Sequence, residues 1–445
     1  MASAVRKIWG YRYFVLLIVW LLYVVNYFDR IAVLTFLPFI QQDLNLTPAE
    51  VGQLASTFFF AYALGQVSAG FLADKFGPKK IMNIAIIVFT AITALTGFIK
   101  TFTQFFILRI GLGIGEAHHF APAAKTITNW FPRAERGKAM SWFTTSNFVA
   151  PAIVPLVITS ISVYWFGGDW RPVFFLLCIP GIIGVLLLWY FITDTPKEML
   201  NKGRLSKEEY QLIEEHEEEA SPIDTPKKKN YGLFLKDVNF YIYMVIMFCN
   251  IGIYWGSTTW LSSFLVKQHG LDLKQMGLFA SAPYIVAAFS TLFGGWLMDK
   301  FGHMKPVALI AYLGCIPVLW ALGSVPKGNT VMLLTFLLLT GFFISLNAGC
   351  VYAYVQKRYP REVVGGATGL SNGFGQFGAF ISPLVAGYLV HVSPDGVQDF
   401  SKVFAFFASL AGIAAIGSFL LKEKPMAYNE ENKLMEPKQT TIHKA

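Results

Sequence analysis

Four ionisable residues lie in stretches of sequence that are otherwise apolar: Asp29, Arg30, Arg109 and Glu116. Ionisable groups at membrane depth are costly, so they usually face a bundle interior or a wet cavity and mark an ion or substrate path. Arg109 and Glu116 are spaced to share one helix face, about two turns apart. Asp29 and Arg30 are adjacent and project roughly 100° apart. Two acids and two bases at similar depth could bind an anion and exchange protons.

The segments that carry these residues are predicted to be membrane-spanning helices. Of the 445 residues, 55% are hydrophobic and only 14% are charged. A helix needs roughly 20 apolar residues to cross a bilayer. The sequence therefore predicts an all-α membrane protein with twelve transmembrane helices in two pseudo-symmetric six-helix bundles. The predicted spans are 13–40, 49–73, 79–99, 103–130, 138–165, 171–193, 240–266, 275–298, 306–324, 330–357, 362–391 and 402–421.

The basic residues predict how these helices are oriented. Most of the 36 Lys and Arg residues fall in segments on the side of the two termini. The positive-inside rule therefore places both termini in the cytoplasm. The same bias explains the net charge of +9, so no nucleic-acid partner is expected, and the lipid bilayer is the expected surrounding. Six basic residues fall on the outer side: Lys100, Arg171, Lys267, Lys274, Lys327 and Lys402.

The spans divide the chain into an N-terminal bundle (1–193), a cytoplasmic linker (194–236), a C-terminal bundle (237–421) and a cytoplasmic tail (422–445). The linker contains Ser206 and Glu209, spaced as a helix capping box, and is interpreted as a surface helix without chemistry. Cys178, Cys249, Cys315 and Cys350 lie inside spans without metal-type spacing. No metal or cofactor is expected.

One pattern occurs in both bundles, each time after the second span. Residues 70–80 read GFLADKFGPKK and residues 295–305 read GWLMDKFGHMK. Glycines at its start allow close helix approach, and glycines after the Phe permit a tight turn. Its aspartates can meet a helix N-terminus, whose dipole favours a carboxylate. We predict a gating latch here; a plain basic turn is the alternative. The predicted gating residues are Gly70, Asp74, Gly77, Asp299 and Gly302.

Four motifs together resemble the anion:cation symporter family of the major facilitator superfamily. They are Asn26-Tyr-Phe-Asp-Arg30, Arg109-Ile-Gly-Leu-Gly-Ile-Gly-Glu116, Trp130-Phe-Pro-Arg-Ala-Glu-Arg136 and Gly369-Leu-Ser-Asn372. The resemblance covers residues 11–421. It implies two halves that rock around a central site and a proton- or sodium-coupled carrier of organic anions such as sugar acids. It also implies substrate-binding roles for Tyr62, Gln66, Asn147, Tyr352 and Asn372.

In the family resembled, the residues that match Asp29 and Glu116 are the proposed proton-coupling pair, and the one that matches Arg30 contacts the anion. We predict that Arg30 faces the cavity while Asp29 pairs with Arg109. Protons on Asp29 and Glu116 would then remove carboxylates that compete with the substrate for Arg30, so proton and anion bind cooperatively. A static buried ion-pair network is the alternative.

Three further residues in the fourth span are open to two interpretations. His119 lies near the face of Glu116 and is assigned to the charge network, although a buried, hydrogen-bonded histidine is the favoured interpretation. His118 falls on the opposite side, and the histidine pair departs from the family pattern. Lys125 resembles a lysine of some sugar-acid carriers but could equally extend its amine to the membrane surface.

The prediction is a proton-coupled symporter for an organic monocarboxylate, a hexonate or hexuronate, working as a monomer in a bacterial inner membrane. Within transport, the alternatives are an aromatic carboxylate symporter and sodium coupling. An organophosphate antiporter is disfavoured because the seventh span lacks a basic residue. A non-transporting membrane sensor is the alternative from another class. An enzyme is not expected, because no nucleophile, base or metal cluster has suitable spacing.

Overall fold

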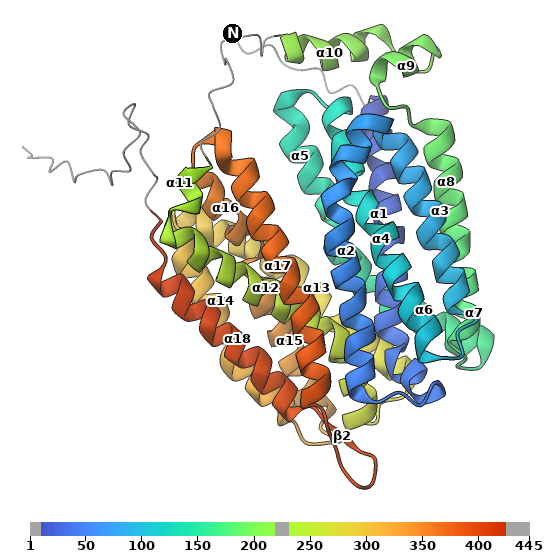
Figure 1. Cartoon of the computed structure of the whole chain (residues 1–445), viewed down its shortest axis with the longest axis vertical. Coiled ribbons are helices and arrows are strands. Elements are labelled where there is room, and N and C mark those ends of the chain that lie inside the picture. Colours follow the sequence, from blue (N-terminus) through green and yellow to red (C-terminus); the bar gives the residue numbers. More distant parts are fainter. Residues whose placement is uncertain (1–9, 219–230, 424–445) are drawn as a thin grey trace, which may run out of the picture. The chain divides into compact units, whose positions relative to one another are not determined.

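The computed structural model describes residues 10–218 and 231–423, and its elements are almost entirely helical (Figure 1). The elements are α1 (Tyr11–Asp43), α2 (Pro48–Phe76), α3 (Pro78–Thr96), α4 (Phe102–Trp130), α5 (Arg133–Thr144), α6 (Ser146–Phe166), α7 (Arg171–Leu176), α8 (Cys178–Phe191), α9 (Pro196–Asn201), α10 (Lys207–Glu218), α11 (Gly232–Leu235), α12 (Val238–Ser263), the π-helix η1 (Phe264–Gln268), α13 (Leu273–Phe301), α14 (Met304–Gly323), α15 (Thr330–Ser345), α16 (Ala348–Arg358), α17 (Arg361–Leu389), strands β1 (His391–Val392) and β2 (Gln398–Asp399), and α18 (Ser401–Leu420).

The prediction of twelve spans is confirmed, since each predicted span coincides with one helix or with consecutive helical segments. Four spans are interrupted: at Thr145, at Leu177, at the π-helix η1, and at Leu346 and Asn347. Ten helical segments in the described part of the chain are long and apolar enough to cross a membrane. The other two spans, α4 and α17, are each 29 residues long. Of these two helices, α4 carries both Arg109 and Glu116.

The described chain forms two compact units. Within the described residues, unit 1 comprises 10–218, 258–285 and 383–399, and unit 2 comprises 231–257, 286–382 and 400–423. Three long helices, α12, α13 and α17, therefore contribute to both units. The predicted domain boundaries stay a prediction. Parts of the predicted linker (219–230) and tail (424–445) lie outside the described residues.

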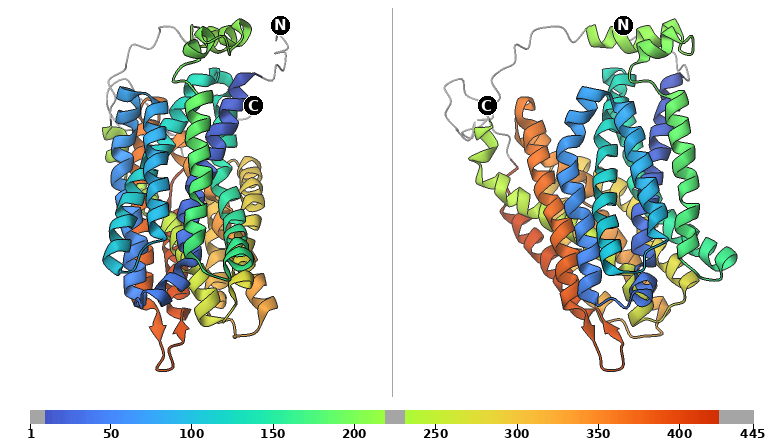
Figure 2. Two further views of the ribbon diagram at one scale, coloured as in Figure 1. Left: turned by 90° about the vertical axis from the view of Figure 1, so that its right-hand side faces the viewer. Right: turned by 45° about the vertical axis from the view of Figure 1, so that its right-hand side comes forward.

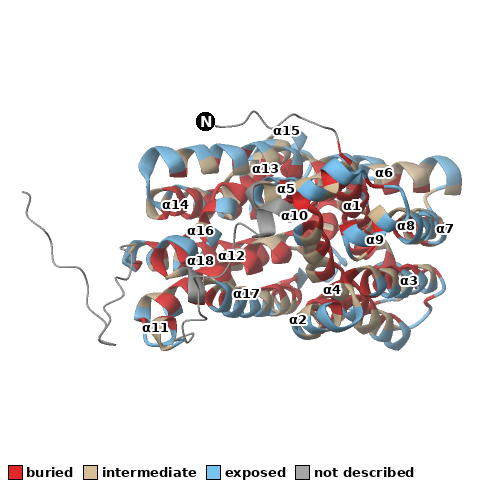
Figure 3. Cartoon of the chain, turned by 90° about the horizontal axis from the view of Figure 1, so that it is seen from above, coloured by how far each residue is buried: buried red, intermediate tan, exposed pale blue. Residues whose placement is uncertain are grey.

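In unit 1, helices bury one face and expose large apolar side chains on the other. On α2, Phe58 and Phe59 are buried whereas Leu64, Val67 and Phe71 are exposed. An apolar outer face of this kind suits contact with lipid. Figure 3 shows buried and exposed stripes along the helices. The short helices α9 and α10 lie across one end of the unit, called here the linker end, and the β1–β2 hairpin lies at the other (Figure 2).

At the hairpin end, α17 crosses α2 at two glycines. A Cβ atom on Gly387 would lie 3.1 Å from Gly52 Cα and 2.7 Å from the Pro48 carbonyl oxygen. The Gln53 side chain donates a hydrogen bond of 3.1 Å to the Tyr388 hydroxyl beside this crossing. The two helices approach so closely because neither carries a side chain at the crossing point.

In unit 2, buried hydroxyl and amide groups link the helices. The Tyr312 hydroxyl donates to Asn250 Oδ1 at 3.1 Å, and the Tyr243 hydroxyl donates to the Val351 carbonyl oxygen at 3.1 Å. Where α15 breaks off before α16, Thr291 of α13 donates to the Ser345 carbonyl oxygen at 3.2 Å. This side-chain bond satisfies a carbonyl at the end of α15, which helps the helix to stop inside an apolar region.

A buried carboxylate holds the start of α12 to the end of α16. Asp237 Oδ2 accepts hydrogen bonds from Arg358 Nε at 2.6 Å and from the Tyr359 hydroxyl at 2.7 Å, while Oδ1 accepts from the backbone and side chain of Asn239. Burial by itself would raise the pKa of Asp237. The hydrogen bonds from Arg358, Asn239 and Tyr359 outweigh burial, and the pKa is lowered.

This cluster predicts an effect on stability. Arg358→Met leaves the Asp237 carboxylate buried without its cation, which should destabilise unit 2 by about 3 kcal/mol. Because the pKa of Asp237 is lower in the folded state, its contribution is present above the unfolded pKa of about 4 and is lost as pH falls through the folded value. Thermal unfolding of detergent-purified protein measures both effects. The stability difference between the native protein and Asp237→Asn should shrink progressively as pH falls below about 4, and a difference independent of pH would contradict this assignment.

Candidate functional site

A buried ion pair in unit 1 joins α1 to α4. Arg30 Nη2 lies 2.8 Å from Glu116 Oε2, and Arg30 Nε donates to the same oxygen at 2.9 Å. The Arg30 and Glu116 side chains are 3% and 0% exposed. The structure therefore brings together the residue predicted to bind the anion and one predicted proton carrier. An internal carboxylate occupies the position that the substrate carboxylate was predicted to take.

Aromatic rings surround the Arg30 guanidinium. Its Cζ atom lies 4.6 Å from the Tyr62 ring centroid, 4.9 Å from that of Phe58 and 5.0 Å from that of Tyr27. Such faces attract a guanidinium, and the attraction is stronger in a desolvated site. Tyr62, predicted to bind substrate, contacts Arg30 directly. The guanidinium is thus held in a pocket that excludes water on several sides.

Arg109 approaches the same region from α4. Its Nε donates to the Leu54 carbonyl oxygen at 3.2 Å, and its Cζ lies 4.5 Å from the Phe58 ring centroid. Both remaining guanidinium nitrogens are buried and have no hydrogen-bond partner among the residues that the structure describes. Arg109 and Glu116 interact electrostatically, in agreement with their spacing along one helix face. Arg109 therefore adds a second positive charge, and two of its nitrogens have hydrogen-bond donors without a described acceptor.

The predicted pairing of Asp29 with Arg109 is wrong. Asp29 is 2% exposed and its Oδ1 has no hydrogen-bond partner in the described part of the chain. It interacts electrostatically with Glu116 and lies beside Thr93 of α3. The reason is geometric: neighbouring residues on a helix project about 100° apart. With Arg30 directed to Glu116, Asp29 is directed to α3.

Neutral polar groups surround this region of α1 and α3. Asn26 is fully buried, and neither its amide nitrogen nor its amide oxygen has a partner among residues 10–218 and 231–423. The Thr90 hydroxyl is buried and equally unpartnered there, and Thr93, one turn further along α3, is the residue beside Asp29. Sequence reasoning missed both threonines. Their spacing of one helical turn in the third span was the available signal, but buried threonines with ordinary interhelical roles look the same in sequence.

The two histidines take different positions at a kink in α4. His118 departs from helical geometry, with φ −87° and ψ 20°. Its Nδ1 donates to the Ile114 carbonyl oxygen at 2.8 Å, and its Nε2 lies 2.9 Å from Ser68 Oγ. His119 is fully buried, stacked on Phe89 and edge-on to Tyr23, and neither ring nitrogen is hydrogen-bonded within the described ranges. The favoured interpretation of a hydrogen-bonded buried histidine is therefore wrong for His119.

The remaining predicted substrate residues are described within their own units. Gln66 is half-buried on α2, about one turn beyond Tyr62, and the Oδ1 atom of Asn147 on α6 is buried without a described partner. In unit 2, the Tyr352 hydroxyl donates to Asn372 Oδ1 at 3.5 Å, a long hydrogen bond. The structure thus brings Tyr352 and Asn372 together within their own unit.

The gating motif forms the predicted turns, but its aspartate Asp74 does not contact the helix N-terminus that was predicted. Gly77 and Gly302 have positive φ of 85° and 72°, which glycine adopts readily. Asp74 forms an ion pair of 2.6 Å with Lys125 instead of meeting a helix N-terminus. The α3 N-terminus is capped instead by Asp194, which accepts from the Lys79 backbone at 2.7 Å.

The remaining residues of the motif make few contacts. A Cβ atom on Gly70 would meet no atom within 4 Å, so close helix approach at this glycine is not seen. Asp299 is exposed. The N-terminus of α14, which follows this second copy of the motif, is capped by Glu423, which accepts from the Lys305 backbone. The gating role itself stays a prediction.

Within the described residues, no group of three or more His, Cys, Asp or Glu side chains could hold a metal ion. The four cysteines are free. The candidate site itself contains two guanidinium groups, two carboxylates and neutral donors and acceptors. Such a set can exchange protons and bind an anion.

Comparison with known proteins gives a consistent family match. The chain matches the family model described as Major Facilitator Superfamily over residues 19–383 and 267–443. It is 29% identical to the curated "Probable sulfoacetate transporter SauU" of Cupriavidus necator, over 92% of this chain and 94% of that protein. It is 28% identical to "Probable galactarate/D-glucarate transporter GarP" of Escherichia coli, over 91% and 93% of the two chains. It is 26% identical to a hexuronate transporter of Bacillus subtilis, over 93% and 98%.

Solved structures share the fold. A bacterial homologue of the human lysosomal transporter Spinster superposes with a TM-score of 0.74 at 18% identity, covering 92% of this chain and 97% of that one. A D-xylose-proton symporter superposes with a TM-score of 0.72 at 16% identity, covering 93% and 99%. These likenesses confirm the predicted fold class.

Proposed function

Because the chain belongs to the major facilitator superfamily, and so is a multi-pass membrane transporter and not an enzyme, we propose that it carries a sugar acid together with protons. The substrate is an organic monocarboxylate such as a hexonate or hexuronate. Transport proceeds by alternating access of the carrier as a monomer in a bacterial inner membrane, with the linker end of unit 1 and both termini in the cytoplasm. The observation that supports the proposal most strongly is the buried Arg30–Glu116 pair.

Competition for Arg30 explains how a proton and an anion become coupled. A substrate carboxylate can form a charge-assisted, bidentate pair with a guanidinium, but Glu116 occupies that guanidinium in the structure. A proton on Glu116 removes the internal competitor and releases Arg30 to the substrate. Proton and anion then each raise the affinity for the other.

The charge count of the cluster predicts the proton requirement. Arg30 and Arg109 contribute two positive charges, and Asp29 and Glu116 contribute two negative charges when ionised. Protonation of one carboxylate leaves a net charge of +1, which a monocarboxylate neutralises. Asp29 supplies the second proton site. A dianion would need protons on both Asp29 and Glu116, because two positive charges must then remain to neutralise it. Because uncompensated charge in a low-dielectric site is costly, each occupied state should be close to neutral.

Two observations favour a sugar acid over an aromatic carboxylate. Three rings near the cluster, those of Tyr27, Phe58 and Tyr62, already pack on Arg30. An aromatic substrate that stacks on the same ring faces would compete with the guanidinium for them. The hexuronate and galactarate/D-glucarate carriers among the relatives also transport polyhydroxylated acids by name. Tyr352 and Asn372 of unit 2 are proposed as neutral groups for substrate hydroxyls.

Uptake into proteoliposomes tests the proposal. An inward pH gradient of about two units should drive accumulation of a hexuronate up to about 100-fold for one proton per monoanion. This stoichiometry is electroneutral, so an imposed membrane potential should have no effect. Empty liposomes and a protonophore are the controls. Accumulation that survives collapse of the pH gradient, or that follows a sodium gradient instead, would contradict proton coupling.

A further inference from the structure

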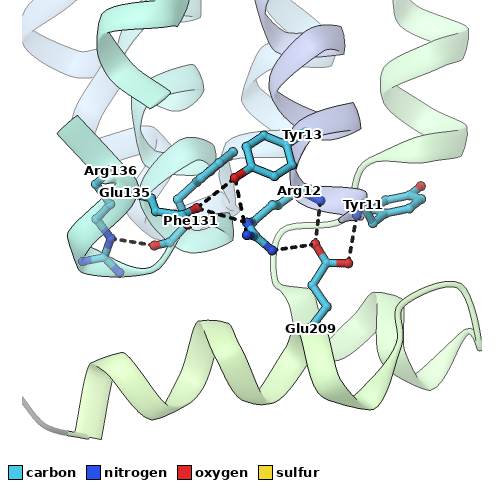
Figure 4. Close-up of polar contacts among 7 residues, drawn as sticks. All are labelled: Tyr11, Arg12, Tyr13, Phe131, Glu135, Arg136 and Glu209. Carbon is cyan, nitrogen blue, oxygen red and sulfur yellow. Dashed lines mark hydrogen bonds and ion pairs between the residues drawn. The ribbon is translucent and has the colours of Figure 1, made fainter. Parts of the chain in front are cut away.

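The α1 N-terminus in unit 1 is capped by a residue from the linker. Its own N-cap residue, Gly10, has no side chain to offer. Glu209 of α10 accepts hydrogen bonds from the backbone N–H groups of Tyr11 at 2.8 Å and Arg12 at 3.0 Å (Figure 4). A carboxylate at this position satisfies orphan N–H groups and is favoured by the helix dipole.

The residues at the start of α1 and at the start of α10 both suit this long-range cap. A Cβ atom on Gly10 would lie 2.0 Å from Glu209 Oε1, so any larger residue would displace the carboxylate. At the start of α10, the Glu209 backbone N–H donates to Ser206 Oγ at 3.1 Å, which confirms one half of the predicted capping box. The other half is not formed, because the Glu209 carboxylate is directed to α1 and not back to its own helix.

Arg12 extends the contact from the linker to α5. Its side chain is 3% exposed and lies between two carboxylates, with Nη1 3.3 Å from Glu209 Oε1 and Nε 3.2 Å from Glu135 Oε2. The Tyr13 hydroxyl donates to the same Glu135 oxygen at 3.3 Å. Figure 4 shows these side chains converging from α1, α5 and α10. One buried cation therefore joins three elements, and each carboxylate has a further hydrogen bond.

We propose that α10 is a strap that fixes the linker end of α1 to α5, with Glu209 as a positioning residue for transport. Arg30 lies on the same helix as Arg12, about 27 Å along its axis, and pairs with Glu116 of α4. The strap therefore sets the position of α1 from which Arg30 exchanges Glu116 for substrate. This role rests on the proposed function.

Two variants separate a strap from a simple helix cap. Glu209→Ala removes both the cap and the tether. Adding Gly10→Asp to Glu209→Ala supplies a local cap in the space that the Glu209 carboxylate vacates, but leaves α1 untied from α10. Glu208→Ala, which changes the neighbouring exposed acid, is the matched control.

The readouts are thermal unfolding, hexuronate uptake and amide hydrogen exchange. Glu209→Ala should lower Tm by roughly 3 °C and the maximal uptake rate about tenfold, with KM changed by less than about twofold. Exchange should accelerate in the first turn of α1 and in α5. The double variant should regain Tm and protection of α1, while uptake stays slow and α5 stays unprotected. Glu208→Ala should behave like the native protein.

Two results would overturn the strap. Recovery of both uptake and α5 protection in the double variant would show that Glu209 only caps α1. Unchanged α5 exchange in Glu209→Ala would show that no tether exists. If the native protein takes up no hexuronate, the proposed function fails instead. Hydrogen exchange still tests whether α10 tethers α1 to α5, because that measurement needs no substrate.

Discussion

Glu116→Gln is expected to abolish proton-driven accumulation and to leave substrate exchange intact. Glutamine has nearly the shape of a protonated glutamate, so Arg30 is permanently released from its internal competitor. Substrate should then bind with an affinity that no longer depends on pH, since the coupling proton has lost its site. In proteoliposomes under an inward gradient of about two pH units, accumulation should fall from about 100-fold to about equilibrium. Counterflow of labelled against unlabelled substrate should continue.

The matched control for this prediction is Asp395→Asn, an equally conservative change at an exposed acid in the hairpin of unit 1. It should accumulate substrate like the native protein. Full proton-driven accumulation by Glu116→Gln would show that Glu116 is not a coupling residue. The cluster would then be a static ion-pair network that fixes helix packing.

Arg30→Gln should have the largest combined effect on stability and transport. The change leaves Glu116, which is 0% exposed, without its cation. Removal of one partner of a buried pair costs about 3–5 kcal/mol, which corresponds to a decrease in Tm of roughly 10 °C for a unit of this size. Uptake and counterflow should both be lost, because the proposed anion-binding guanidinium is absent. Thermal unfolding and counterflow in one preparation measure the two effects.

The double variant Arg30→Gln with Glu116→Gln separates the two roles of the arginine. Two neutral amides can hydrogen-bond to each other, so most of the lost stability should return. Transport should not return, since no cation replaces Arg30. If the double variant regains counterflow, the anion is bound elsewhere, and Arg109, with two unpartnered donor nitrogens in the described structure, becomes the principal candidate.

The strap and the ion pair act on the same helix at different depths. Glu209 holds the first turn of α1, and Glu116 holds Arg30 near its middle. When Arg30 exchanges Glu116 for substrate, the proposed strap therefore holds the linker end of α1 in place. This arrangement explains why an acid outside the membrane is expected to alter the rate of transport without altering substrate affinity.

Local patterns in the sequence were sufficient to predict the helices. Ten of the predicted spans have a local signal, because crossing a bilayer requires about 20 mainly apolar residues in succession, and no distant contact alters that signal. The turns at Gly77 and Gly302 were predictable for the same reason, since positive φ is a property of the residue itself. Arg109 and Glu116 were placed on one face by helical periodicity alone.

Only the tertiary structure decided which charged groups meet. Asp29 was predicted to pair with Arg109, but the rotation of α1 directs Arg30 to Glu116 and Asp29 to Thr93. Asp74 pairs with Lys125, and Glu209 caps a helix 198 residues away in the chain. Periodicity fixes the angle between residues on one helix, whereas contact depends on the rotation and depth of two helices against each other. That relation is set by packing across the whole unit, so the sequence alone determined the groups present at membrane depth but not their partners.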